Sequence, residues 1–186
     1  MGFFKTLKIL FRLMKDAPKL AQAIKEQQSA YAAMTTEDLS ALSDDELFSA
    51  AVSRLESHID YDQPEASFAA LSNPQKVVYA VNCLEVEVNN GGLCQFFVNS
   101  SSIVAPYISD YLGILGADEH KLLFDSFIRK HGIDLSNLDS FKIRHIKDFE
   151  KQVQRYPFDE YDDAFYALSS LEEPIAAYIR SNISSF

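Results

Sequence analysis

The sequence predicts an all-α fold, with one compact multi-helix domain preceded by an N-terminal amphipathic helical extension. The chain has 186 residues with only six glycines and six prolines, so few positions interrupt a helix. Hydrophobic residues make up 47% of the chain, which is enough to bury a sizeable core. Apolar residues recur at three- and four-residue intervals in most segments, as they do on the buried face of a helix.

The first segment predicts a basic amphipathic helix. Its apolar face consists of Phe3, Phe4, Leu7, Leu10, Phe11 and Met14. Another face carries Lys5, Lys8, Arg12 and Lys15. We expect Asp16 and Pro18 to interrupt this helix and a second helix to run from Pro18 to about Met34. Residues 1–34 are therefore predicted to be a helical extension, and residues 35–186 an acidic all-α domain.

Two helices are predicted next, separated by a loop over residues 61–67. Ser43 and Glu46 have the spacing of a capping box at the start of the first. Its buried face is Leu47, Phe48, Ala51, Val52, Leu55 and Ile59. The second helix is expected to have Asn73 as its cap and Pro74 at its first helical position. Its core face is Val77, Val81, Leu84 and Val88.

The remaining helices are bounded by glycine, proline and capping residues. Residues 100–132 are expected to form two helices, the first ended by Gly116 and the second capped by Asp118 and ended by Gly132. A further helix over 139–155 should stop before Pro157. Two more are expected over 158–168 and 170–183, and the second of these has a capping-box pair, Ser170 and Glu173.

The charge is unevenly distributed along the chain. The net charge is −10, but residues 1–30 carry +4, so the rest carries −14. An acidic body repels nucleic acid and anionic membranes and attracts basic proteins. Solubility alone is the plainer interpretation of the same charge.

Signatures of enzymes and metal proteins are missing from the sequence. The four histidines, His58, His120, His131 and His145, are far apart, and no HExxH, Walker, GxGxxG or GxSxG motif occurs. We therefore expect no catalytic residue, no metal and no cofactor. Cys83 and Cys94 lack CxxC spacing, and no secretory signal or run of about 20 apolar residues occurs, so a reduced cytoplasmic protein is expected.

The stretch "EVEVNNGGLCQFF", from Glu85 to Phe97, is the most unusual part of the chain. Successive asparagines and glycines favour the end of a helix, and Leu93, Phe96 and Phe97 then resume helical spacing. This pattern predicts a corner between two helices, with a buried polar clasp of Glu87, Asn90 and Gln95. The alternative is a ligand pocket or active site around those three residues. A thiol enzyme would need a base beside Cys94, and none is identifiable.

The N-terminal helix is open to more than one interpretation. "MGFFKT" fits a myristoylation pattern, and the basic face could lie on an anionic membrane. We favour a docking element that packs on the acidic body of its own chain or of a mate in a homodimer. Contact with a membrane through residues 1–15 stays as the less favoured alternative.

The corner and the segments after it carry a family resemblance. "LEVEVNNGGLCQFFVNSS" and the later "FDEYDDAFYAL" and "EEPIAAYI" resemble the bacterial DNA-mimic protein family over roughly residues 40–182. The residues that match its motif are Glu87, Asn90, Gly91, Gly92, Gln95, Phe96, Phe97 and Asn99. Leu93 stands where the family has an aromatic or other bulky residue. These motif residues are expected to serve the structure.

The resemblance implies a compact all-α fold and one function, the presentation of carboxylates that imitate DNA phosphates to a basic DNA-binding protein. Such a mimic does not bind nucleic acid directly. DNA carries one charge per about 1.7 Å of axis, so a mimic needs a dense and ordered row of carboxylates. The candidate carboxylates are Asp44, Asp45, Glu46, Asp159, Glu160, Asp162, Asp163, Glu172 and Glu173. We therefore expect a non-enzymatic acidic protein-binding module, with ligand binding or catalysis near Glu87 as the alternative.

Overall fold

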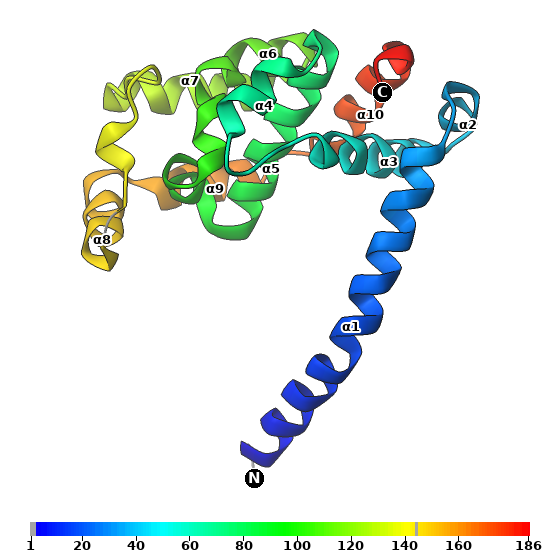
Figure 1. Ribbon diagram of the computed structural model, residues 1–186. Helices are drawn as coiled ribbons and strands as arrows, with labels where there is room; N and C mark the ends of the chain where they lie inside the picture. The colour runs from blue at the N-terminus through cyan, green and yellow to red at the C-terminus, as the bar shows by residue number, and fades with distance from the viewer. Residues whose placement is uncertain (1–2, 144) are drawn as a thin grey trace.

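A computed structural model describes residues 3–143 and 145–186, with the side chains of residues 17–143, 145 and 147–186. This part of the chain contains ten α-helices and three short 3-10 helices, and no strand (Figure 1). The all-α prediction is confirmed.

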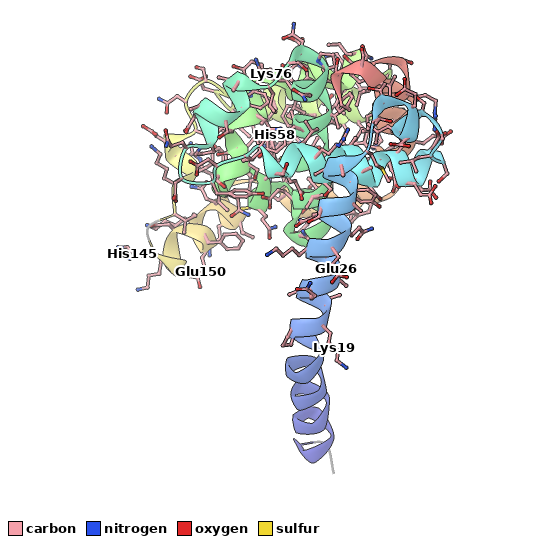
Figure 2. The ribbon with its side chains drawn as sticks, turned by 45° about the vertical axis from the view of Figure 1, so that its right-hand side comes forward. Lys19, Glu26, His58, Lys76, His145 and Glu150 are labelled. Carbon is pink, nitrogen blue, oxygen red and sulfur yellow. The ribbon has the colours of Figure 1, made fainter. Side chains whose placement is uncertain are left out.

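The N-terminal helix is continuous, contrary to the predicted break. Helix α1 spans Phe3–Ala33 and passes through Pro18. Proline removes one backbone hydrogen bond. The residues that follow Pro18 are mostly strong helix formers such as Lys, Leu, Ala and Gln, and they carry the helix onward. The backbone of α1 leads away from the rest of the molecule, as Figures 1 and 2 show. The amphipathic faces expected for residues 1–15 lie outside the described side chains.

Three helices follow α1, namely α2 (Thr36–Ser40), α3 (Asp44–Ser57) and α4 (Pro64–Ala70). The Ser43–Glu46 capping box at the start of α3 is confirmed. The expected face of α3 points inward, with Leu47, Ala51, Leu55 and Ile59 buried and Phe48 and Val52 half-buried. The loop predicted over residues 61–67 is wrong in its second half, because Pro64 occupies the first position of α4.

Helix α5 (Asn73–Val98) occupies the centre of the fold. Its cap is Ser72, which forms a capping box with Gln75, so the prediction of Asn73 as cap is wrong by one residue. The expected core face is confirmed, since Val77, Val81, Leu84 and Val88 are all buried. A 3-10 segment, η1 (Ser100–Tyr107), leads to α6 (Ile108–Ile114) and α7 (Asp118–His131).

Two glycines lie at the predicted ends of α6 and α7, and both have positive φ, +69° at Gly116 and +60° at Gly132. Asp118 is the first residue of α7 and Ala117 its cap, so the predicted cap is displaced by one position. The helix expected over 139–155 is shorter than predicted. A 3-10 turn, η2 (Asp139–Phe141), precedes α8 (Ile146–Arg155).

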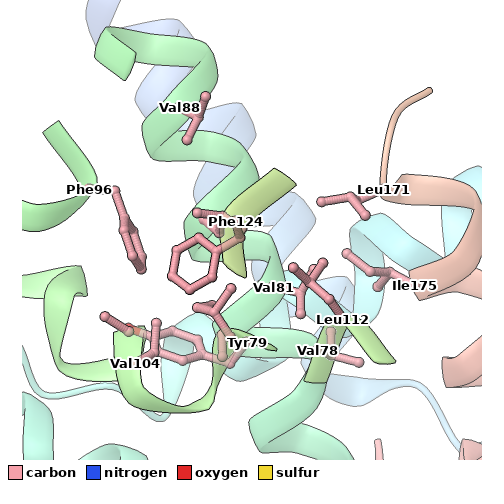
Figure 3. Close-up of a cluster of buried hydrophobic side chains, with 14 of the residues drawn as sticks. Val78, Tyr79, Val81, Val88, Phe96, Val104, Leu112, Phe124, Leu171 and Ile175 are labelled. Atoms are coloured by element: carbon pink, nitrogen blue, oxygen red, sulfur yellow. The ribbon is translucent and has the colours of Figure 1, made fainter. Parts of the chain in front are cut away.

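The chain ends with α9 (Phe158–Tyr166), α10 (Glu172–Ser181) and the 3-10 turn η3 (Ile183–Ser185). The core forms around α5, which contacts α3, α6, α9 and α10. Figure 3 shows its centre, where Val81 of α5 lies among Leu112 of α6, Phe124 of α7 and Ile175 of α10. These four side chains are fully buried.

Candidate functional site

The helix breaks inside α5 at the glycine pair of the motif. Gly91 and Gly92 have non-helical backbone angles, so α5 is two helices that meet at a corner. Gly92 has φ +79°, a conformation that other residues rarely adopt. A Cβ on Gly92 would lie 2.1 Å from a carboxylate oxygen of Asp162. We call residues 90–92 the α5 corner.

Helix α9 holds both sides of the α5 corner. The backbone N–H of Leu93 donates to Asp162 Oδ1 at 2.8 Å, which satisfies a free donor at the start of the second half. The hydroxyl of Tyr166 donates to the carbonyl oxygen of Val88 at 2.7 Å, in the last turn of the first half. Asp162 and Tyr166 are four residues apart on α9 and so lie on the same face of that helix.

A polar cluster lies on another side of the α5 corner, around the carboxylate of Glu87. Gln95 Nε2 and Asn99 Nδ2 donate to Glu87 Oε2 at 2.7 and 2.8 Å, and Ser101 Oγ donates to Oε1 at 2.6 Å. Because Gly91 lacks a side chain, the Gln95 amide can cross over it, and a Cβ there would lie 2.1 Å from Gln95 Oε1. We call Glu87, Gln95, Asn99 and Ser101 the Glu87 cluster.

The predicted clasp shares Glu87 and Gln95 with this cluster, but the prediction of Asn90 as a member is wrong, and Asn99 and Ser101 take part instead. The Asn90 side chain is exposed and forms no hydrogen bond with any residue that the structure describes. Ser101 takes part although its sequence context gave no signal for it. The two phenylalanines of the motif, Phe96 and Phe97, are buried in the core.

A second buried carboxylate, Glu85, was not singled out from the sequence. Its Oε1 accepts the Ser170 hydroxyl at 2.9 Å and the backbone N–H of Leu171 at 2.8 Å, so it caps the start of α10. The predicted capping box of Ser170 with Glu173 is therefore wrong, because Glu85 takes the place of Glu173. His120 lies nearby, and its burial lowers the pKa of the imidazole below its usual value.

The nine carboxylates proposed as an acidic row lie on three helices. Asp44, Asp45 and Glu46 form the first turn of α3, Glu172 and Glu173 the first turn of α10, and the other four lie on α9. Arg180 Nε donates to Asp44 Oδ1 at 2.9 Å, so the far end of α10 meets the start of α3. Glu172 and Arg180 lie eight positions apart on α10. The carboxylates of α3, near Arg180, are therefore about 12 Å from the first turn of α10, measured along this helix.

Several of these carboxylates are already used within the fold. Asp44 pairs with Arg180, Glu46 bonds to Ser43, and Glu160 lies 3.7 Å from Lys130. Asp162 is half-buried against the α5 corner, and burial raises the pKa of its carboxyl above the usual value. Of the nine, those that are exposed and have no ion-pair partner in the described part of the chain are Asp45, Asp159, Asp163 and Glu173.

A further acidic surface was missed in the sequence because its carboxylates belong to different helices. Asp118 and Glu119 in the first turn of α7 and Glu173 in the first turn of α10 line the same hollow of about 350 Å³. Carboxylates in a first turn complement the positive end of the helix dipole, so part of their placement is structural.

One of the pockets of the molecule adjoins the Glu87 cluster. It has a volume of about 160 Å³ and lies between α3, the segment before α4, α5 and the start of η1. Its lining includes Glu56, Tyr61, Tyr79, Asn82, Cys83 and Glu87. Neither Asn90 nor Gln95 lines it. We call it the α5 pocket.

The thiols are poor nucleophiles in this environment. Cys83 and Cys94 are both free. Burial raises the pKa of Cys83 to about 12 and that of Cys94 to about 11, and nearby carboxylates add to both shifts. Reactive cysteines have lowered pKa values, so neither residue has the character of a catalytic thiol.

Metal sites and membrane spans are both missing from the part of the chain that the structure describes. Within it, no group of three or more His, Cys, Asp or Glu side chains is arranged to hold a metal ion. Likewise, no helix in this part of the chain is both long and apolar enough to cross a bilayer.

Comparisons with known proteins identify the family. Neither the curated proteins nor the solved structures give a match. A model of the DMP19-like protein family matches residues 69–182, which is more than half of the chain and includes the α5 corner, α9 and all of α10. The match begins later than the resemblance over residues 40–182 suggested, and it leaves α3 outside. The chain belongs to the DMP19-like family, a family of DNA-mimic proteins.

Proposed function

We propose that the protein is a non-enzymatic, acidic protein-binding module that engages a basic DNA-binding protein by imitating DNA. The observation that carries this proposal concerns the nine predicted carboxylates, four of which are exposed and have no ion-pair partner among the described residues. These four are Asp45, Asp159, Asp163 and Glu173. Family membership supports the same function.

The proposed binding has the same physical basis as the binding of DNA to a basic protein. A DNA-binding protein presents lysines and arginines that pair with phosphates, and its affinity falls steeply with salt. Exposed carboxylates held on helices offer negative charges with which such a surface can pair. Carboxylates that are already paired, such as Asp44, contribute less because their charge is compensated.

The direction of α1 favours an accessible acidic surface. Residues 1–30 carry the excess of positive charge, and the backbone of α1 leads away from the body (Figures 1 and 2). A basic helix folded onto the body would compete with a basic partner. The extended α1 leaves the body open to it.

The catalytic alternative is less well supported. Both thiols have raised pKa values, and of Glu87, Asn90 and Gln95 only Glu87 lines the neighbouring pocket. Free cysteines agree with the reduced, cytoplasmic environment expected from the sequence.

Self-association into a homodimer stays part of this proposal, and sedimentation of the purified protein tests it.

The mimicry is tested by capture and displacement. Proteins retained from lysate on the immobilised protein at low salt are identified and purified. Each is bound to a fluorescent DNA duplex, and the acidic protein is then titrated in. A mimic displaces the duplex, and its affinity falls at least about tenfold when salt rises from 50 to 200 mM.

Two matched variants show whether displacement depends on the positions of the carboxylates or only on the total negative charge. Neutralising Asp45, Asp159, Asp163 and Glu173 as Asn or Gln should weaken displacement at least about tenfold. A control that neutralises the exposed Glu37, Asp62, Asp110 and Glu150 changes the net charge equally and should have a much smaller effect. Equal losses in both variants, or no displacement of DNA by the unmodified protein, would overturn the proposal.

A further inference from the structure

The α5 pocket holds negative charge without a positive partner. Glu56 and Glu87 both line it, and no lysine, arginine or histidine does. Burial raises the pKa of Cys83, and the charges of Glu87 and Glu56 raise it further. The pKa of Tyr61 is raised in the same way, by burial and then by Glu56. The groups of this pocket therefore share an environment that disfavours any additional negative charge and favours a cation.

A buried amide in this pocket lacks a hydrogen-bond partner. Asn82 is only 8% exposed and lines the pocket. Its side chain forms no hydrogen bond with the residues that the structure describes. The nearby buried Glu85, in contrast, accepts two. The amide atoms of Asn82 are not among the enclosed atoms that lack a partner, so they are open to the pocket and can bond to a ligand or to water there.

The carboxylates of the pocket can still accept hydrogen bonds. Ser101 is the one described donor to Glu87 Oε1, which leaves acceptor capacity on that oxygen. Glu56 forms no hydrogen bond or ion pair with the described residues, and partial burial raises the pKa of its carboxyl. Two acceptors of this kind on opposite elements, α3 and α5, suit a head group with several N–H donors.

The other walls are aromatic and apolar. Tyr61 and Tyr79 both line the pocket, and Tyr79 lies one helical turn before Cys83 on α5. Tyrosine rings attract cations through their faces. Val86 is 46% exposed at the same pocket and offers a contact for a short hydrocarbon stem. A volume of about 160 Å³ equals that of about five water molecules, which is enough for a small head group with one or two methylenes.

We propose that the α5 pocket binds the guanidinium or ammonium head of an organic cation, held by the carboxylates of Glu56 and Glu87, the amide of Asn82 and the rings of Tyr61 and Tyr79. A planar guanidinium has five donors and pairs best with two acceptors. This site is separate from the exposed carboxylates of the proposed DNA mimicry and does not depend on them.

The test uses the full chain and two probes, agmatine and N-acetylarginine amide, followed by NMR or calorimetry. We expect saturable binding of agmatine at or below about 10 mM. Binding of both probes indicates a pocket open to an arginine side chain of another protein. Binding of agmatine alone indicates a free small molecule.

Variants assign the binding to the pocket. Glu56→Gln and Asn82→Leu should each weaken binding at least tenfold, and Glu37→Gln, a matched change at an exposed glutamate elsewhere, should alter it less than twofold. Asn82→Leu should keep the fold, because the Asn82 side chain has no hydrogen-bond partner among the described residues to lose. If that variant fails to fold, Glu56→Gln at an exposed position decides the result.

Three outcomes would overturn the proposal. One is that neither probe binds saturably. Another is that butylurea, an uncharged analogue of the guanidinium head, binds as tightly as agmatine. The third is that Glu56→Gln binds as the wild type does. None of these outcomes affects the displacement of DNA, so the failure of either proposal can be recognised separately.

Discussion

Gly92 and Asp162 form one structural unit although 70 positions separate them. The positive φ of Gly92 turns the chain at the α5 corner, and the missing Cβ leaves room for the Asp162 carboxylate. That carboxylate in turn accepts the Leu93 N–H. The glycine is therefore required twice, for its backbone conformation and for the close approach of α9.

Alanine substitutions at two of the glycines with positive φ, Gly92 and Gly116, should separate these requirements. Gly92→Ala should lower the free energy of unfolding by about 3 kcal/mol or more, because left-handed strain is combined with a clash. Gly116→Ala should cost about 1 kcal/mol, because a Cβ there meets nothing within 4 Å. Denaturant unfolding measures both values. Equal costs would mean that Asp162 moves away freely.

The buried His120 should make stability depend on pH. Burial lowers the pKa of its imidazole below 6.5, against the opposing influence of Glu85 and Glu119. As pH falls through 6.5, His120 binds a proton in the unfolded chain but not yet in the folded chain. The free energy of unfolding therefore decreases toward acid pH. Above that pH the imidazole is neutral in both states, and it no longer lowers the free energy of unfolding.

Urea unfolding between about pH 5 and 7.5 tests this dependence. His120→Gln should lose part of the decline in stability toward acid pH, whereas His58→Gln, at an exposed histidine, should retain it. An unchanged decline in His120→Gln would show that the imidazole is not the group responsible.

Part of the α5 corner could be predicted from the sequence. The Asn-Gly-Gly run marks the break, and Glu87 and Gln95 stand eight residues apart around it, so their pairing follows from local geometry. The contacts of Asp162 with Leu93 and of Glu85 with Leu171 span 69 and 86 residues. No local pattern encodes them, because they depend on how α9 and α10 pack on α5.

At the scale of elements, the helix caps show where local rules apply and where they fail. The Ser43–Glu46 box forms as predicted because both members lie within one turn of α3. The Ser170–Glu173 pair has the same spacing, but Ser170 donates instead to Glu85. A buried carboxylate from another helix therefore replaces the local partner.

The junction of α1 with the body depends on Arg54 of α3. Its Nε donates to the carbonyl oxygen of Tyr31 at 2.8 Å, and its guanidinium also contacts the carbonyl oxygens of Ala32 and Met34. Tyr31 and Met34 pack against the core. The last turn of α1 is thus attached to the body, whereas residues 17–30 are exposed.

Two truncations should therefore differ in stability. Removal of residues 1–22 should change the melting temperature by no more than about 2 °C, because the described side chains among them, those of residues 17–22, are exposed. Removal of residues 1–34 deletes Tyr31 and Met34 and leaves the Arg54 side chain without three of its acceptors. This deletion should lower the melting temperature by about 5 °C or more. Equal melting temperatures would show that the last turn of α1 contributes nothing.

At the scale of the whole molecule, charge is separated in space as well as in sequence. A helix of 31 residues extends about 46 Å, several times the Debye length of about 8 Å at physiological salt. The basic part of α1 is then screened from most of the acidic body. At low salt the screening is weaker, and attraction between the two parts is the force that could fold α1 back.

Small-angle X-ray scattering of the full chain and of the 1–22 deletion tests this arrangement. The deletion removes about two thirds of α1, so the maximum dimension should shorten by about 20–30 Å at physiological salt. The full chain should keep its maximum dimension between 50 and 500 mM salt, because an extended α1 needs no screening to stay apart. A full chain that is compact at low salt and lengthens as salt is added would show that α1 covers the acidic surface, and a basic partner would then have to displace it before binding.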